Sequence, residues 1–200
     1  MPRPREYDDQ LRVRLIEEAA RLLVEEGPAA VTTRRVAAAV GTSTTAIYSL
    51  VGSKDDLVQA VCDEGFARLA AHLAAVEVSD DPLVDIHRMA DAYFDMALES
   101  PALYRVMFDR TGPEMVEDDP RPGAETLTTL VHAVRRAVDA GLLRGEPFDL
   151  AVQLWALGHG VVSLALTGML GPPVAARALM VRAGLALIGG LRLPAAASSG

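Results

Sequence analysis

Apolar residues recur at spacings of three and four along almost the whole chain of 200 residues, and alternating strand-like runs are absent. Such spacing puts the apolar side chains on one face of a helix. Glycine and proline interrupt the pattern, as at Gly27-Pro28 and at the GPP of 171–173, where helices are expected to end. The sequence therefore predicts an all-α protein of about nine helices.

Capping residues and helix breakers set the expected bounds of these helices. Ser53 and Asp56, for example, are spaced as a capping box at the start of one helix. The expected helices are 8–26, 34–40, a third that ends near 50, 54–76, 82–99, 101–108, 124–140, 147–170 and 173–190. The acidic segment 109–123 is expected to be a loop, and the tail 194–200 to be disordered.

The net charge of −8 is distributed unevenly. Residues 1–54 hold eight basic and seven acidic side chains, for a net of +1, and the remaining 146 residues carry −9. Phosphates are neutralised by Lys and Arg. The distribution is therefore compatible with an N-terminal end that faces nucleic acid and an acidic body.

Cysteine and hydropathy bear on where the chain works. Cys62 is the one cysteine, so an intrachain disulfide is excluded, and the N-terminus lacks the apolar core of a secretory signal. A cytoplasmic location is expected. The most apolar stretch, 154–170, is interrupted by polar residues and is shorter than the roughly 20 residues that cross a bilayer. We interpret it as a helix buried in protein and expect no membrane partner.

The stretch VAAAVGTSTTAIYSLVGSK, residues 36–54, carries two short helical patterns around one glycine. Thr33 is expected to N-cap the first helix and Ser43 the second. Gly41 can close the first helix in the left-handed conformation. Two short helices joined by a turn with glycine are a helix-turn-helix signature.

The second of these helices can present a polar face. Thr44, Thr45, Tyr48 and Ser49 can point outward, and Ala46, Ile47 and Leu50 can pack inward. Exposed N–H groups at the helix starts after Thr33 and Ser43 can bind phosphates. The side chains of Arg34, Tyr48 and Lys54 can contact the same two DNA backbones. This chemistry leaves two interpretations open, a helix that reads the major groove of DNA or a capped and solvated turn.

The run IEEAARLLVEEGPAAVTTRRVAAAVGTSTTAIY, followed by GSKDDLVQAV, resembles the N-terminal DNA-binding domain of the tetracycline-repressor (TetR) family of transcriptional regulators. The order helix, Gly, T-T-x-x-V-A, Gly, Tyr and G-S-K-x-x-L is far more specific than a bare helix-turn-helix. The resemblance implies a helix-turn-helix DNA-binding domain at 1–54, a linking helix at 54–76, and a C-terminal ligand-binding and dimerisation domain at 77–193.

The resemblance also implies roles for individual residues. Thr33 and Tyr48 are expected to contact phosphates, Lys54 the DNA backbone, and Arg34, Thr44, Thr45 and Ser49 to lie nearest the bases; Arg35 and Ser43 complete the expected set. The sequence departs from the family pattern at SLV, 49–51, where members commonly carry aromatic or basic residues. Affinity is therefore expected to depend more on Arg34, Arg35 and the N-terminal arginines.

The C-terminal runs LWALGHGVVSLAL and AYFDMALESPALYRVMF resemble the WHG-type subgroup of the family. Trp155 and His159 lie four residues apart and share a helix face. With other apolar and aromatic residues they are expected to line a pocket for an apolar or amphipathic effector: Ile86, Met89, Tyr93, Tyr104, Met107 and Phe108. For each of these residues, a place in the plain hydrophobic core is the open alternative.

The last two helices are apolar around most of their circumference, so we expect them to pack against a second copy of the chain. The predicted protein is then a homodimer on a near-palindromic double-stranded DNA operator, released by the effector and needing no cofactor or metal. A regulator without effector control and an activator are the alternatives. A helical enzyme is less favoured, because the sequence holds no G-x-S-x-G, P-loop, G-x-G-x-x-G, H-E-x-x-H or paired-cysteine pattern.

Overall fold

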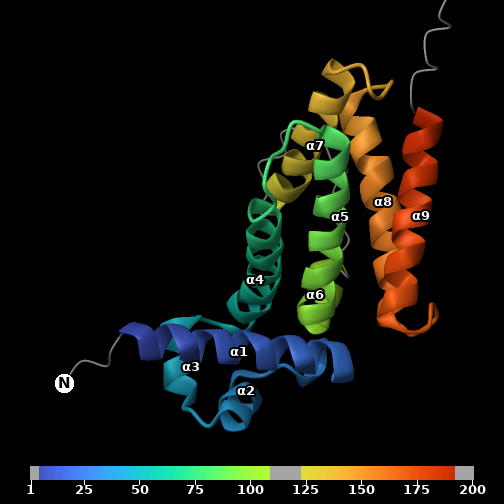
Figure 1. The fold of residues 1–200 in the computed structure, drawn as a ribbon. Helices are drawn as coiled ribbons and strands as arrows, with labels where there is room; N and C mark the ends of the chain where they lie inside the picture. The colour runs from blue at the N-terminus through green and yellow to red at the C-terminus, as the bar shows by residue number, and fades with distance from the viewer. Residues whose placement is uncertain (1–4, 109–122, 192–200) are drawn as a thin grey trace, which may run out of the picture. The chain divides into compact units, whose positions relative to one another are not determined.

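The fold is given by a computed structural model that describes residues 5–108 and 123–191 (Figure 1). Within these residues the chain forms nine α-helices and one 3-10 helix and no strand, which confirms the all-α prediction. The elements are α1 (Arg5–Glu26), η1 (Pro28–Ala30), α2 (Thr33–Val40), α3 (Thr44–Leu50), α4 (Lys54–Ala74), α5 (Pro82–Glu99), α6 (Pro101–Phe108), α7 (Ala124–Asp139), α8 (Pro147–Leu166) and α9 (Pro173–Leu191).

Most helix bounds match the sequence prediction, and α5 and α6 match it at both ends. α8 is shorter than predicted because Thr167 caps it and Gly168 then adopts a positive φ of 77°. The 3-10 helix η1 was not predicted. The tail 194–200 and nearly all of the acidic loop predicted at 109–123 lie outside the described residues.

The chain divides into two compact units that do not follow chain order. The first takes the chain up to Arg68 together with the segment from Ser100 through α6, and the second takes Leu69–Glu99 and α7 to α9. α4 is one continuous helix whose residues belong to both units. The functional domains expected at 1–54 and 77–193 stay a prediction, but by packing α6 belongs with the N-terminal helices.

The core of the first unit forms where α1 packs on α2, α3 and α6 (Figure 1). Ile47 of α3 is completely buried in it. Leu103 and Val106 of α6 lie in the same cluster. The other large side chains fully buried in this cluster are Leu15, Ile16, Leu22, Val31, Val36, Leu57 and Val61.

Arg68 connects three segments of the first unit. Its guanidinium donates to Glu17 of α1 at 2.8 Å and to Glu64 of its own helix at 2.9 Å. A third bond, of 2.9 Å, reaches the Ser100 hydroxyl, directly before α6. These contacts hold the start of α6 against α1 and α4.

The second unit is a bundle in which α5, α7, α8 and α9 run side by side (Figure 1). Arg177 joins α9 to α5, since it donates to Asp91 at 2.8 Å and also pairs with Asp95. Its guanidinium carbon lies 4.7 Å from the centre of the Phe94 ring. Such a cation over an aromatic face adds to the ion pairs.

A buried carboxylate closes the loop between α4 and α5. Asp85 is 3% exposed and accepts hydrogen bonds from the Ser79 amide at 3.0 Å and the Ser79 hydroxyl at 2.6 Å. Arg136 of α7 donates to Asp85 at 2.7 Å and to the Ser79 carbonyl at 2.5 Å. Hydrogen bonds from Ser79, and then from Arg136, keep the pKa of Asp85 below its usual value although burial opposes this.

Asp85→Asn should destabilise the protein by about 2 kcal/mol at neutral pH, because the amide cannot accept all three hydrogen bonds. The pKa of Asp85 is lower in the folded protein than in the unfolded chain, where it is near 4. The stabilisation by Asp85 is therefore full above the unfolded pKa and is lost as the pH falls through the folded pKa. Urea unfolding between pH 7 and pH 3 should show the parent and the variant converging at the acid end. Asp139→Asn, at an exposed position of α7, is the control; a gap that stays constant with pH contradicts the prediction.

Candidate nucleic-acid interface

The α2–turn–α3 element is fixed by three local features. Thr32 is the N-cap of α2, and its hydroxyl accepts from the Arg35 amide at 3.2 Å. Gly41 closes α2 in the left-handed conformation, with φ 77° and ψ 39°. The Ser43 hydroxyl then accepts from the Ala46 amide at 3.1 Å and caps α3. The helix-closing role predicted for Gly41 and the capping role predicted for Ser43 are confirmed.

The predicted capping role of Thr33 is wrong, because the helix begins one residue earlier than expected. Thr33 is the first residue of α2 and is half-buried, and its neighbour Thr32 supplies the capping hydroxyl. Two adjacent threonines can each cap a helix, so local chemistry could not separate them. A phosphate contact by Thr33 stays a prediction.

Three of the four side chains expected on the outward face of α3 are exposed. Tyr48 is 60% exposed, and Thr45 and Ser49 are exposed as well. Thr44 is half-buried. The opposite face is anchored by Ile47, with Ala46 and Leu50 packed partly against the core. A polar and aromatic face on a helix held from behind is what groove reading needs.

The basic side chains differ in how free they are. Arg34 is exposed and has no partner among the residues that the structure describes. Arg35 pairs with Glu26 of α1 at 2.5 Å. Lys54 donates to the Pro28 carbonyl of η1 at 2.9 Å, which leaves two of its three protons for other acceptors. Among the described residues Arg34 therefore has no contact to break before it binds another group, whereas Arg35 must first leave its ion pair with Glu26.

Glu26→Gln should raise affinity for DNA about threefold at low salt, because it releases Arg35 for phosphate contact and removes a repelling charge. The slope of log affinity against log salt should steepen by about one. Glu25→Gln is the matched control, since Glu25 pairs with Arg21 on the same helix. Equal changes in the two variants would show that only general charge matters.

The start of α4 is locked by the predicted capping box. The Ser53 amide and hydroxyl donate to the Asp56 carboxylate at 2.8 and 2.7 Å, and the Asp56 amide donates to the Ser53 hydroxyl at 3.2 Å. The Ser53 hydroxyl, and then its amide, lower the pKa of Asp56. Gly52 allows this approach, because a Cβ there would lie 2.5 Å from an Asp56 oxygen and φ is 110°. Lys54, the first residue of α4, is thereby held where its side chain reaches the Pro28 carbonyl of η1.

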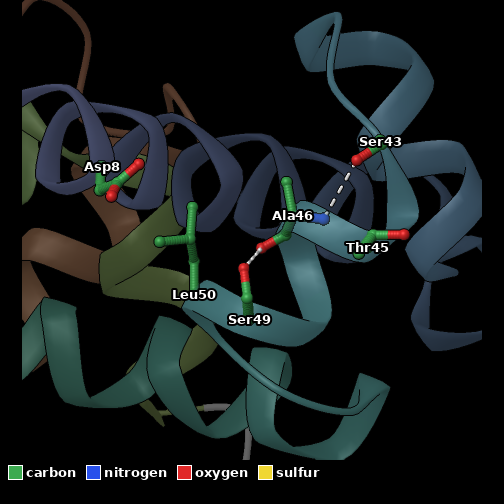
Figure 2. A pocket seen from close by; sticks show the side chains of 6 residues that line it. All are labelled: Asp8, Ser43, Thr45, Ala46, Ser49 and Leu50. Carbon is green, nitrogen blue, oxygen red and sulfur yellow. Dashed lines mark hydrogen bonds between the residues drawn. The ribbon is translucent and has the colours of Figure 1, made fainter. Parts of the chain in front are cut away.

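A groove of about 310 Å³ lies beside α3 in the first unit (Figure 2). It is lined by Asp8, Ser43, Thr45, Ala46, Ser49 and Leu50. Asp8 comes from α1 and was not among the predicted site residues. No sequence pattern relates it to α3, because the packing of the two helices brings them together.

The family comparisons agree with this geometry. A model described as "Bacterial regulatory proteins, tetR family" matches residues 15–61, and one described as "Tetracyclin repressor-like, C-terminal domain" matches 86–187, about half of the chain. The chain belongs to the TetR family. Its members are DNA-binding transcriptional regulators rather than enzymes. The C-terminal description names no WHG subgroup, so that assignment stays a prediction.

Curated relatives of the chain include HTH-type transcriptional regulators from mycobacteria. The HTH-type transcriptional regulator Mb1846 of Mycobacterium bovis is 25% identical over 145 residues, 71% of this chain and 62% of that protein. The uncharacterized HTH-type transcriptional regulator Rv0681 of Mycobacterium tuberculosis is 27% identical over 162 residues, 80% of this chain and 72% of that protein. The chain thus matches less than two thirds of the length of the first relative.

Solved structures share the fold over nearly the full chain. A protein of unknown function from Rhodococcus sp. RHA1 is 26% identical, with a TM-score of 0.74 over 92% of this chain and 96% of that one. The TetR family regulator PfmR from Thermus thermophilus is 19% identical, with a TM-score of 0.68 over 90% of this chain and 100% of that one. The second likeness shows the fold alone.

The residues predicted to line an effector pocket in this TetR-family chain fall into both units. Tyr104, Met107 and Phe108 of α6 lie in the first unit, where Phe108 makes edge contacts with Tyr104 and Phe66. Met107 lies against Gly65 of α4, where an added Cβ would come within 2.5 Å. The others belong to the second unit: Ile86, Met89, Tyr93, Trp155 and His159.

Three of the second group are in contact. The Tyr93 hydroxyl lies 3.1 Å from Nδ1 of His159, and the Trp155 and His159 rings are 5.5 Å apart between centres. Nε2 of His159 lies 3.4 Å from the Ser163 hydroxyl. Burial lowers the pKa of His159, which favours the neutral form of its ring. Within the described residues no group of His, Cys, Asp or Glu is placed to hold a metal ion.

Much of the apolar surface of the last two helices is exposed in the single chain. α8 and α9 are long and apolar enough to cross a membrane by length and composition, and only 22% and 17% of their most apolar windows are buried. Leu164, Met169, Val174 and Leu185 are the large apolar side chains exposed on them or between them. The prediction that 154–170 is a buried helix is thus only partly confirmed, because most of this stretch is not buried within a single chain.

Proposed function

We propose that this protein is a homodimeric transcriptional repressor that binds a near-palindromic DNA operator and leaves it when a small apolar or amphipathic molecule binds. The observation that carries the proposal is the exposed face of α3 with Thr45, Tyr48 and Ser49, backed by the buried Ile47. Arg34, on the preceding helix, has no partner among the described residues, and a phosphate contact there can fix the position of α3 on the duplex.

Residue roles in the proposed complex follow from exposure and from hydrogen-bonding capacity. Tyr48, Lys54 and Thr33 contact phosphates, and Arg34 joins them or turns to the bases. Thr44, Thr45 and Ser49 lie nearest the base edges. Hydroxyls can both donate and accept, so specificity comes from how they are placed in the major groove.

Dimerisation is supported by the exposed apolar surface of α8 and α9. A twofold interface between two copies covers that surface once on each subunit. It also presents two copies of α3, which fit half-sites about 34 to 36 Å apart, or a multiple of that. A cytoplasmic location belongs to the same proposal.

Release by an effector is supported by the pairing of a neutral His159 with Tyr93 and Trp155 in an apolar bundle. These groups could hold an uncharged polar end of an otherwise apolar molecule. α4 supplies residues to both units, so a change in its tilt would alter the spacing of the two reading helices.

The DNA-binding part is tested by selecting bound sequences from a random pool with the full-length protein. A near-palindrome should be enriched. The Tyr48→Ala, Lys54→Ala double variant should then bind every selected sequence at least about tenfold more weakly, because both lost contacts are to phosphates. Arg88→Ala, at an exposed arginine of α5, is the control, and unchanged affinity of the double variant contradicts the assigned surface.

The effector part is tested with a thermal-shift screen of apolar and amphipathic compounds. Each compound that stabilises the protein is titrated with and without the operator. Coupling between two sites is reciprocal, so operator should weaken compound binding by the same factor by which the compound weakens operator binding. Equal affinity for the compound in both titrations would mean that DNA binding is not under effector control.

A further inference from the structure

The groove beside α3 contains a carboxylate on the face that is proposed to meet DNA (Figure 2). Asp8 has no hydrogen-bond or ion-pair partner among the described residues. An ionised carboxylate only accepts hydrogen bonds. It repels phosphate oxygens, so contact with the DNA backbone does not explain its position.

Ser49 lines the same groove, and its hydroxyl oxygen can also accept a hydrogen bond. Its hydroxyl donates to the Ala46 carbonyl at 3.0 Å, which uses its proton and leaves its lone pairs (Figure 2). Ser43, the N-cap of α3, differs, because its oxygen accepts from the Ala46 amide and its proton has no acceptor among the described residues. The carboxylate of Asp8 and the hydroxyl oxygen of Ser49 are therefore two acceptors that line the same groove.

Base edges in the major groove differ in what they offer such a pair. Guanine presents two acceptors and thymine presents a carbonyl, whereas the amino groups of cytosine N4 and adenine N6 are donors. Acceptors in the protein groove therefore disfavour guanine and thymine and favour cytosine and adenine. A lysine or arginine of another protein is also a donor, but the place of the groove on α3 favours DNA.

We propose that Asp8 accepts the one N–H that base pairing leaves free on the exocyclic amino group of a cytosine or adenine at one position in each half-site, with Ser49 as a second acceptor on the same groove. The proposal rests on the operator binding proposed above and adds a specificity-determining residue from α1.

The test compares selected sequences for the full-length parent, Asp8→Asn and Ser49→Ala, with Asp9→Asn as the matched control. Asp9 is an exposed neighbour outside the groove, and its variant makes the same change in charge. The parent and Asp9→Asn should both require cytosine or adenine at one half-site position. Asp8→Asn should lower that discrimination about tenfold, because an amide also donates to guanine and thymine. Ser49→Ala should lower it less.

The outcomes separate this inference from the proposed function. If the parent enriches no sequence, both are wrong. If the parent enriches an operator and Asp8→Asn keeps the same base preference, only the role of Asp8 is wrong. If Asp8→Asn and Asp9→Asn raise affinity equally for all sequences, Asp8 acts only through general charge, and the inference is again wrong. Tighter parent binding to a basic protein than to any DNA also overturns it.

Discussion

Replacing Leu164 and Leu185 together by aspartate should turn the protein into a folded monomer. Both side chains are exposed in the single chain, by 43% and 57%, so the substitutions leave the interior of the bundle unchanged. At a twofold interface each substitution places charges on both subunits in a surface that must lose its water. The monomer should hold a palindromic operator at least about 100-fold more weakly, because the second half-site no longer benefits from a linked partner.

Light scattering over a range of protein concentrations measures the first effect, and operator titration measures the second. Val78→Asp is the control, since Val78 is an exposed apolar residue outside α8 and α9, 79% accessible. Circular dichroism should show the same helix content for parent, control and double variant. A double variant that stays dimeric at the same concentrations would place the interface on another surface.

Ile47→Ala should destabilise the first unit by about 3 kcal/mol. It should also abolish operator binding at temperatures where the first unit of the variant is unfolded. Ile47 is completely buried between α3 and the helices behind it, so the lost methyl groups leave a cavity. The second unit does not contain Ile47, and its helices should keep their signal at temperatures where α3 has lost its packing.

Hydrogen exchange of the backbone amides, measured at increasing temperature, reports the stability of each of the two units separately. Tyr48→Ala is the matched control, because the neighbouring side chain is 60% exposed. It should lose DNA affinity without losing stability, whereas Ile47→Ala should lose both. Equal stability of Ile47→Ala and the parent would mean that α3 is not anchored by this residue.

Much of the fold could be predicted because its boundaries are set by local chemistry. Gly41, Ser43 and the pair Ser53–Asp56 act within a few residues of their partners, so spacing alone identifies them. The apolar spacing of α5 and α6, together with the prolines that begin them, likewise predicted both ends of each helix. Where two neighbours carry the same chemistry, as Thr32 and Thr33 do, the register could not be chosen.

The state of the site residues could not be predicted in the same way, because it depends on contacts between distant segments. Lys54 meets Pro28 across 26 residues, and Arg35 meets Glu26 across nine. Neither contact follows a helical spacing. Asp8 reaches the α3 groove only because α1 packs on α3, and periodicity does not fix that packing. Sequence therefore identified the residue types of the surface, but not which of them are already engaged.

The membership of α6 in the first unit has a consequence for chimeric regulators. Leu103 and Val106 complete the core that supports α2 and α3, although they follow α5 in the chain. A DNA-reading module cut from this protein at 54 or 68 would leave that part of its core facing solvent. Grafting its specificity onto another regulator thus requires two segments, the one ending at 68 and the one covering 100–108, or a recipient whose own sixth helix fits the same surface.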